Sequence, residues 1–103
     1  MGSSRVFQAV AEPNRRALLD LLAVREYSVS DLVARFSISQ PAISHHLRIL
    51  RKAGLVKCRQ VGRQRIYRLK GRPLRQVYAW VSHYERFWTG KLDVLGEHLR
   101  RNP

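Results

Sequence analysis

Cysteine and long apolar runs are both scarce in this chain of 103 residues. Cys58 is its single cysteine, which excludes an internal disulfide, a redox pair of cysteines and a zinc site built from several cysteines. No apolar run approaches the roughly 18 residues of a membrane-spanning helix, and the N-terminus lacks the apolar segment of a signal peptide. We therefore expect a cytoplasmic protein that does not insert into a membrane.

Acidic residues are also few, and they lie near the two ends of the chain. There are seven of them against twenty Lys and Arg, which gives a formal net charge of +13, and none lies between residues 32 and 84. A charge run is usually a solvated surface, but an acid-free interval that crosses several predicted elements favours repeated contact with phosphate. The charge indicates a polyanionic partner, with nucleic acid first and an anionic membrane surface second.

The length of the chain allows one small domain with a single core, which we place over residues 1–103. Apolar residues make up 45% of the sequence, enough for a globular fold and too many for global disorder. Residues 1–4 are expected to be disordered or to be the remnant of a tag.

Helical spacing of apolar residues predicts three helices in the first third of the chain. A short first helix ends at Pro13, because the residue before a proline avoids the helical conformation. A second helix covers about 13–24. A third, at about 31–36, opens with a side-chain cap from Ser28 or Ser30.

A fourth helix follows after a three-residue turn. Ser39 caps its start, and a proline occupies its first turn, where proline costs least. Its core stripe is Ile43, Leu47 and Leu50, and Gly54 provides the left-handed cap that ends it.

The rest of the chain predicts a basic β-hairpin and one long helix. The hairpin has strands at 55–61 and 65–69 with a turn at 62–64. Beyond it, apolar residues recur at gaps of three or four over 73–100, which is typical of an amphipathic helix. The predicted class is mainly α with a small β-hairpin.

A helix, a short turn, a second helix and then a basic hairpin form a winged helix-turn-helix. The fourth helix fits the major groove of DNA, where its outward side chains can meet base edges, while the hairpin tip can enter the minor groove or grip the backbone. The residues predicted to bind DNA are Ser39, Gln40, Pro41, Ser44, His45, Arg48, Arg51, Arg59, Arg63, Gln64 and Arg65.

Three side chains near this surface have more than one interpretation. Ser44 contacts either a base or a backbone phosphate. His46 turns toward the core side of its helix, so we expect a packing or capping role. For Cys58 we expect a small half-buried residue and not a redox sensor, because it has no resolving partner.

The segment SQPAISHHLRILRKAGLV, residues 39–56, closely resembles the recognition helix and wing entry of ArsR-type winged-helix repressors. The resemblance continues in residues 11–16 with the leucine-rich helix after them, in Gly62–Arg63, and in residues 84–88. The aromatic last helix is most similar to the SdpR-like autorepressor branch. The resemblance implies a homodimer that binds a palindromic operator and represses transcription, including that of its own gene.

The same resemblance implies that the first and last helices join the two subunits. The apolar stripe of the last helix is wider than one small domain can cover, although its aromatic residues could instead host an apolar effector. The residues predicted to form the dimer interface are Val6, Phe7, Val10, Val77, Trp80, Val81, Tyr84, Phe87, Trp88, Leu92 and Leu95.

The chain departs from the metal-sensing members of that family. Its third helix has no thiol, and His83, Asp93, Glu97 and His98 lack the family's spacing on the last helix. We predict no metal and no cofactor, with an atypical zinc or nickel site among these four residues as the alternative.

The sequence also lacks a catalytic set, so we predict that the chain is not an enzyme. The signal stays open among a small-molecule effector, a sequestering protein and no effector at all. Besides the specific repressor, which would be associated with the nucleoid, the alternative is a nonspecific architectural protein that binds DNA or RNA.

Overall fold

Five α-helices and three β-strands make up the part of the chain that the computed structural model describes, residues 2–88. Their order confirms the predicted mainly α-helical fold with a small β-hairpin between the fourth and fifth helices. The elements are α1 (Gly2–Val10), α2 (Pro13–Val24), β1 (Tyr27–Ser28), α3 (Val29–Val33), α4 (Gln40–Lys52), β2 (Val56–Val61), β3 (Gln64–Leu69), the 3-10 turn η1 (Arg72–Leu74), α5 (Arg75–Ser82) and the 3-10 turn η2 (Glu85–Phe87).

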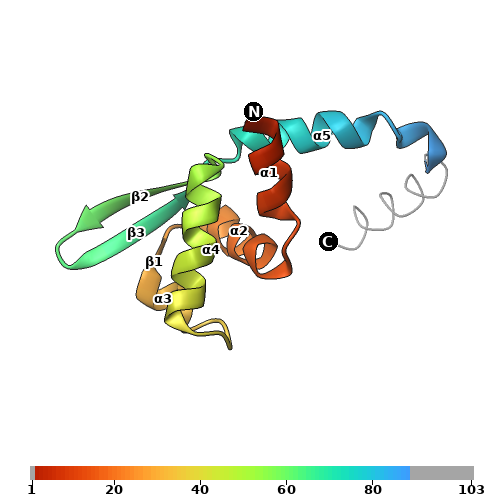
Figure 1. Cartoon of the computed structure of the whole chain (residues 1–103). Helices are drawn as coiled ribbons and strands as arrows, with labels where there is room; N and C mark the ends of the chain where they lie inside the picture. Colours follow the sequence, from red (N-terminus) through yellow and green to blue (C-terminus); the bar gives the residue numbers. More distant parts are fainter. Residues whose placement is uncertain (1, 89–103) are drawn as a thin grey trace, which may run out of the picture.

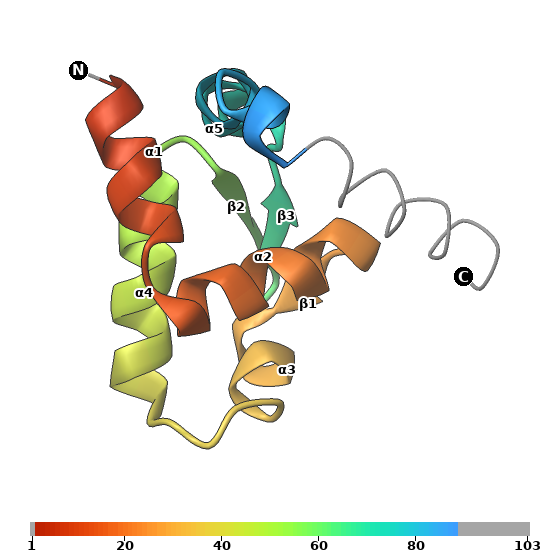
Figure 2. The same cartoon turned by 90° about the vertical axis from the view of Figure 1, so that its right-hand side faces the viewer.

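The first four helices form one body, and α4 packs against the other three. We call β2, β3 and the turn between them the wing. Figure 1 shows the wing extending from the body on one side and α5 extending on the other. In the view of Figure 2, α1 lies beside α4, with α2 and α3 next to them. This arrangement leaves part of α4 uncovered on the side of the wing.

The core stripe predicted on α4 is buried. Ile43, Leu47 and Leu50 are 0%, 1% and 0% exposed, which confirms the helical spacing. The other buried apolar side chains come from α1, α2 and α3, from the loop after α4 and from the strands. They are Val6, Ala9, Leu18, Leu19, Leu22, Tyr27, Leu32, Ala53, Leu55, Val56 and Tyr67.

Both predicted caps of α4 are present. The Ser39 hydroxyl accepts a hydrogen bond from the backbone N–H of Ala42 at 3.3 Å, which satisfies one of the free donors of the first turn. After the helix, Gly54 has a φ of 77°, and the N–H of Leu55 donates to the carbonyl of Leu50 at 3.0 Å. This is the Schellman arrangement, which a residue with a Cβ adopts only under strain.

The turn of the wing is tighter than predicted. Val61 and Gln64 are paired across the strands, so the loop has two residues, Gly62 and Arg63, instead of the three at 62–64. Gly62 has a φ of 60° and Arg63 a negative φ, the signs of a type II′ turn. That turn matches the right-handed twist of the strands that it joins.

The sequence does not predict the third strand. β1 pairs antiparallel with β3, with Tyr27 opposite Tyr67 and Ser28 opposite Ile66, so the sheet has the order β1–β3–β2. Two residues are too few to show a strand periodicity, and their partners lie far along the chain. The pairing therefore exists only through the tertiary fold.

Two helix bounds differ from the sequence predictions. α3 ends at Val33 and not near residue 36, because Arg35 and Phe36 already donate to carbonyls three residues back, which tightens the last turn. α1 begins at Gly2, so residues 2–4 are helical and not disordered. That residues 1–4 are the remnant of a tag stays a prediction.

The prediction of one long helix over 73–100 is wrong within the described residues, because the helix there is short. α5 ends at Ser82, whose hydroxyl donates to the carbonyl of Ala79 at 2.7 Å and so competes with the helical backbone. The N–H of Tyr84 then bonds the carbonyl of Val81, three residues back, and one 3-10 turn follows. The remainder of the prediction lies outside the described residues.

Among residues 2–88, no helix combines the length and the apolar character that crossing a membrane requires.

Candidate nucleic-acid interface

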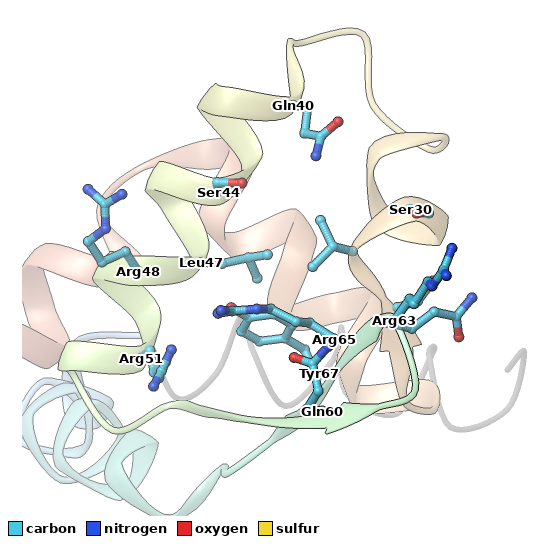
Figure 3. Close-up of a pocket in the computed structure, with 13 residues that line it drawn as sticks. Ser30, Gln40, Ser44, Leu47, Arg48, Arg51, Gln60, Arg63, Arg65 and Tyr67 are labelled. Atoms are coloured by element: carbon cyan, nitrogen blue, oxygen red, sulfur yellow. The ribbon is translucent and has the colours of Figure 1, made fainter.

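A cleft of about 460 Å³ lies between α4 and the wing. Figure 3 shows Gln40 and Ser44 on the α4 side, Arg63 and Arg65 on the wing side, and Ser30 where α3 meets the cleft. Four of the lining residues are arginines and none is acidic. The lining residues are Ser28, Val29, Ser30, Gln40, Ser44, Leu47, Arg48, Arg51, Gln60, Arg63, Gln64, Arg65 and Tyr67.

The local geometry of α4 and the wing explains this lining. Positions 40, 44, 48 and 51 follow the spacing of one helix face. Across the hairpin, Gln60 and Arg65 are partners, and directly opposite residues project from the same face of a sheet. A polar helix face and a polar sheet face therefore border the same space.

Most of the residues predicted to bind DNA lie at this cleft, and four do not. Ser39 is occupied as the cap of α4, Pro41 and His45 are exposed elsewhere on that helix, and Arg59 projects from the opposite face of the wing. Those that line the cleft are Gln40, Ser44, Arg48, Arg51, Arg63, Gln64 and Arg65.

Four polar residues of the cleft are absent from the sequence prediction of DNA contacts. They are Ser28, Ser30, Gln60 and Tyr67. The two-residue period of the hairpin could have shown Gln60, because it faces the same way as Arg65 once the turn is placed. Ser30 and Tyr67 reach the cleft through the pairing of β1 with β3, which the sequence does not reveal.

Arg59 has an acidic partner on the outer face of the wing. Its Nη2 lies 2.8 Å from Oε1 of Glu26, and this hydrogen bond lowers the pKa of the Glu26 carboxyl. Both side chains are about half exposed, so the pair adds little stability. Farther along this face, the ammonium of Lys57 lowers the pKa of Lys70, a sign of crowded positive charge.

The two adjacent histidines of α4 have different environments. His45 is exposed, whereas the side chain of His46 is 13% exposed and its Nδ1 lies 3.1 Å from Nη1 of Arg15. Burial lowers the pKa of His46, with the charges of Arg15 and His45 acting in the same direction and Glu12 opposing them. His46 is a packing residue, as the sequence predicted.

Tyr67 forms part of the inner end of the cleft. It is 6% exposed, and burial raises the pKa of its hydroxyl, with Cys58 adding to the rise and Arg51 opposing it. Cys58 is the cross-strand partner of Tyr67 and is half-buried, which confirms the expected burial of that cysteine. The tyrosine thus stays a neutral phenol at neutral pH and can donate a hydrogen bond.

The sequence profile of the family described as bacterial regulatory protein, arsR family, matches residues 12–57, from the cap of α2 into β2. The transcriptional repressor SdpR of Bacillus subtilis is 35% identical over 81 residues, which are 79% of this chain and 90% of SdpR. The chain belongs to the arsR family. It is a DNA-binding transcriptional repressor with a winged helix-turn-helix, as the resemblance in residues 39–56 implied.

Other relatives of this ArsR-family chain agree. An HTH-type transcriptional regulator of Mycobacterium tuberculosis is 38% identical over 88 residues, 85% of this chain and 79% of the relative. A homologue of the transcriptional repressor SmtB from Synechocystis is 42% identical over 78 residues, 76% of this chain, which spans only 59% of that relative. These proteins are transcriptional regulators and not enzymes.

Solved structures show the same fold. A crystal structure of an ArsR family transcriptional regulator superposes with a TM-score of 0.75 at 30% identity, covering 85% of this chain and 91% of the other. An ArsR-like transcriptional regulator from Rhodococcus sp. RHA1 gives a TM-score of 0.74 at 27% identity, covering 99% and 94%.

A second surface of this ArsR-family protein is apolar and lies on α5 and around the 3-10 turn η2 that follows it. The helix has no buried residue, and a hollow of about 440 Å³ is lined by Trp80, Val81, Tyr84, Phe87 and Trp88. Trp80 is 51% exposed and Phe87 70% exposed. The ring of Phe7 from α1 meets that of Trp80 edge-on at 5.5 Å, so both helices contribute to this surface.

The other residues predicted to form the dimer interface differ in burial, and two of them lie outside the described part of the chain. Val6 is 1% exposed, so it packs inside the chain and is not free to join an interface. Val10 is half-buried against the core and Val77 is half-buried on α5. Leu92 and Leu95 lie outside the described residues.

The candidate metal ligands are mostly outside the described part. His83 is exposed just after α5, and Asp93, Glu97 and His98 belong to the undescribed residues. Within residues 2–88, no three side chains of His, Cys, Asp or Glu come together as a metal site.

Proposed function

We propose that this ArsR-family repressor acts as a homodimer on a palindromic operator and represses its own gene. The observation that carries the DNA-binding part is the cleft between α4 and the wing, with four arginines and no acidic residue in its lining. Positive charge in a concave surface focuses the field on an anionic ligand. The SdpR-like resemblance supports autoregulation.

In this proposal, α4 reads the operator in the major groove. Gln40, Ser44 and Arg48 lie along one face of that helix, and their donors and acceptors match base edges, with arginine best suited to guanine. His45 is exposed beside them, within reach of the same duplex. Arg63 and Arg65 at the wing tip then contact the neighbouring minor groove or its phosphates.

The apolar surface on α5 is the proposed subunit interface. Burying its aromatic rings against a second copy removes an exposed patch that a soluble monomer rarely carries. A two-fold axis through this surface would present two α4 helices to half-sites about 34 Å apart, one turn of duplex.

No metal or cofactor is part of this proposal, and the signal is either a small molecule, a sequestering protein or the concentration of the repressor itself. For the apolar hollow we favour the subunit interface over an apolar effector site. Its aromatic lining is continuous with Phe7 of α1.

The test is a binding titration with two duplexes. One is the DNA immediately upstream of the gene for this chain, and the other is a scrambled duplex of equal length and composition, each at two salt concentrations with and without zinc. A preference for the upstream duplex of about 10³ or more supports a specific autorepressor. Equal affinity for both favours a nonspecific architectural protein, and loss of binding with zinc would reveal a metal site.

Arg48→Ala locates base reading within the cleft. We expect a loss of about 1 to 3 kcal/mol on the upstream duplex with relaxed preference at one operator position. Arg75→Ala is the matched control, because Arg75 is an exposed arginine on α5. A uniform loss on both duplexes would instead make Arg48 a phosphate contact.

A further inference from the structure

The guanidinium of Arg15 joins three parts of the fold. Its Nε donates to the carbonyl of Ala9 at 2.8 Å and its Nη2 to the carbonyl of Gln8 at 3.1 Å, both near the end of α1. Its Nη1 lies 3.1 Å from Nδ1 of His46 on α4. One side chain from α2 therefore contacts both α1 and α4, two helices that lie side by side in Figure 2.

The chemistry of this contact fixes the state of the imidazole. A guanidinium only donates hydrogen bonds and does not lose its proton in proteins. Nδ1 of His46 must therefore be the acceptor, so the ring is neutral and carries its proton on Nε2. Glu12 helps to hold the backbone of Arg15 in place, because its carboxylate accepts the backbone N–H of Arg15 at 3.0 Å.

A proton on Nδ1 would break this link. It would point an N–H at the Arg15 guanidinium and replace a hydrogen bond by repulsion between two cations. The protonated ring would instead be drawn to Oε2 of Glu12, 3.7 Å away. His45 is the other titratable group acting on the ring, and Arg5 of α1 lies farther along α4, beside Ile49 and Lys52.

The position of His46 connects this contact to both proposed interfaces. It follows His45 on α4, two residues before Arg48 at the cleft. At the other end, α1 carries Phe7 against Trp80 of α5. A change at Arg15 can thus alter how α4 is seated relative to the helices of the subunit interface.

We propose that Arg15 and His46 are positioning residues for DNA recognition, because α4 is held in its reading orientation only while neutral His46 accepts the hydrogen bond from Arg15. Neither residue needs to touch DNA. The inference rests on the proposed binding of DNA by α4, and it adds that specific binding weakens when His46 is protonated.

The first test compares pH profiles of operator binding. Fluorescence anisotropy with the upstream duplex at constant ionic strength gives the affinities of the wild type and of His46→Gln, whose amide oxygen can still accept from Arg15. We expect the ratio of wild-type to His46→Gln affinity to fall between about pH 7.5 and about pH 5.5, by less than the roughly tenfold that a histidine with its ordinary pKa would give, because burial lowers the pKa of His46. A constant ratio overturns the proposal.

His45→Gln is the matched control for the titrating group. It should keep the acidic loss of affinity, because His46 is intact. Protonation of His45 beside phosphate would strengthen binding and so acts in the opposite direction. Loss of the effect in His45→Gln would assign the proton to His45 and overturn the proposal.

Arg15→Lys tests the guanidinium itself against Arg16→Lys. Lysine keeps the charge but cannot present donors to three acceptors in one plane. Arg16 is the control because it also contacts the end of α1, where it donates to the carbonyl of Val10 at 2.8 Å. We expect Arg15→Lys to lose about tenfold in affinity for the upstream duplex and little for the scrambled one. An equal loss in Arg16→Lys would mean that holding α1 is enough, and it would overturn the role given to His46.

Nuclear magnetic resonance of the imidazole nitrogens keeps the inference separate from the proposed function. In the free wild-type protein at about pH 7.5, His46 should be neutral with its proton on Nε2. A proton on Nδ1 overturns the positioning role whatever the DNA result. Equal binding of the two duplexes at this pH, with the expected tautomer present, defeats the specific-repressor proposal alone.

Discussion

At the scale of the residue, neighbouring positions of α4 have separate tasks. Residues 40, 44 and 48 border the cleft, 43, 47 and 50 fill the core, and His46 lies against Arg15. Periodicity predicts the first two sets from the sequence, because they follow the turn of the helix. It cannot predict the partner of His46, which comes from α2 through the tertiary fold.

Stability should fall in two steps as the pH decreases. The pKa of His46 lies below its ordinary value of 6.5, so the unfolded chain takes up this proton first and stability is lost as the pH falls from about 6.5. Burial opposes ionisation of Glu12, but hydrogen bonds from Arg15 and Asn14 together with the charges of His46 and Arg15 outweigh it and lower its pKa. Its contribution is lost below about pH 4.5.

Urea unfolding at a series of pH values measures both steps. His46→Gln should remove the step nearer neutrality and leave the acidic one. If the variant retains both, another group titrates in that range and the environment assigned to His46 is wrong.

Replacing Gly54 and Gly71 by alanine compares a glycine with a positive φ to one with a negative φ. Gly54 has a φ of 77°, and a Cβ at this position would lie 3.7 Å from Cγ of Pro73, an ordinary contact. Gly54→Ala should therefore cost about 1 to 2 kcal/mol through backbone strain alone. Gly71 has a φ of −75°, and Gly71→Ala should stabilise by about 0.4 to 1 kcal/mol. Chemical denaturation gives both values, and equal effects would contradict the left-handed cap.

At the scale of the element, the wing has two faces of different character. Arg65 and Gln60 share the face that borders the cleft, whereas Arg68 pairs with Lys57 on the other. Alternation along the strands predicts these faces once the turn is known. The turn predicted from the sequence is one residue too long, because a two-residue loop with one glycine is hard to tell from a longer one.

Arg65→Ala and Arg68→Ala separate those faces. Loss of one phosphate contact lowers the slope of log affinity against log salt by about one unit. We expect that change for Arg65→Ala and none for Arg68→Ala, measured on the upstream duplex over a range of salt concentrations. Equal changes in both variants would show that DNA meets both sides of the wing.

The helix α5 shows where sequence periodicity fails. Its apolar residues continue beyond Ser82, yet the backbone turns into 3-10 geometry there. Helices in proteins owe most of their stability to burial of an apolar face, and within the described chain that face of α5 is not buried. The spacing of apolar residues shows which of them could share one face of a helix. Whether the helix continues along that face depends on a second surface that buries it.

At the scale of the whole molecule, the two proposed interfaces lie on different sides. The cleft opens between α4 and the wing, and the aromatic surface lies on α5 and around η2. Figure 1 shows the wing and α5 extending in different directions from the body. Charge and aromatic content in the sequence predicted both kinds of surface. The sequence could not show that Val6, assigned to the interface, is buried within the chain.

Phe87→Ala tests the aromatic surface as a subunit interface. Phe87 is 70% exposed, so its truncation should leave the unfolding free energy of the monomer nearly unchanged. An aromatic anchor in an interface is worth about 2 kcal/mol or more, and the substitution removes one from each subunit, so the dimer dissociation constant should rise roughly 1000-fold in sedimentation equilibrium. Val24→Ala, at 78% exposure on α2, is the control and should leave dimerisation unchanged.

Coverage of this aromatic face by a second copy, as proposed, would tie gene control to dosage. Below the dimer dissociation constant, the dimer concentration follows the square of the monomer concentration, so halving the protein leaves about a quarter of the dimers. A repressor of its own gene would then resume its synthesis sharply as cell growth dilutes it. The strength of packing between aromatic rings would set the protein level at which the feedback operates.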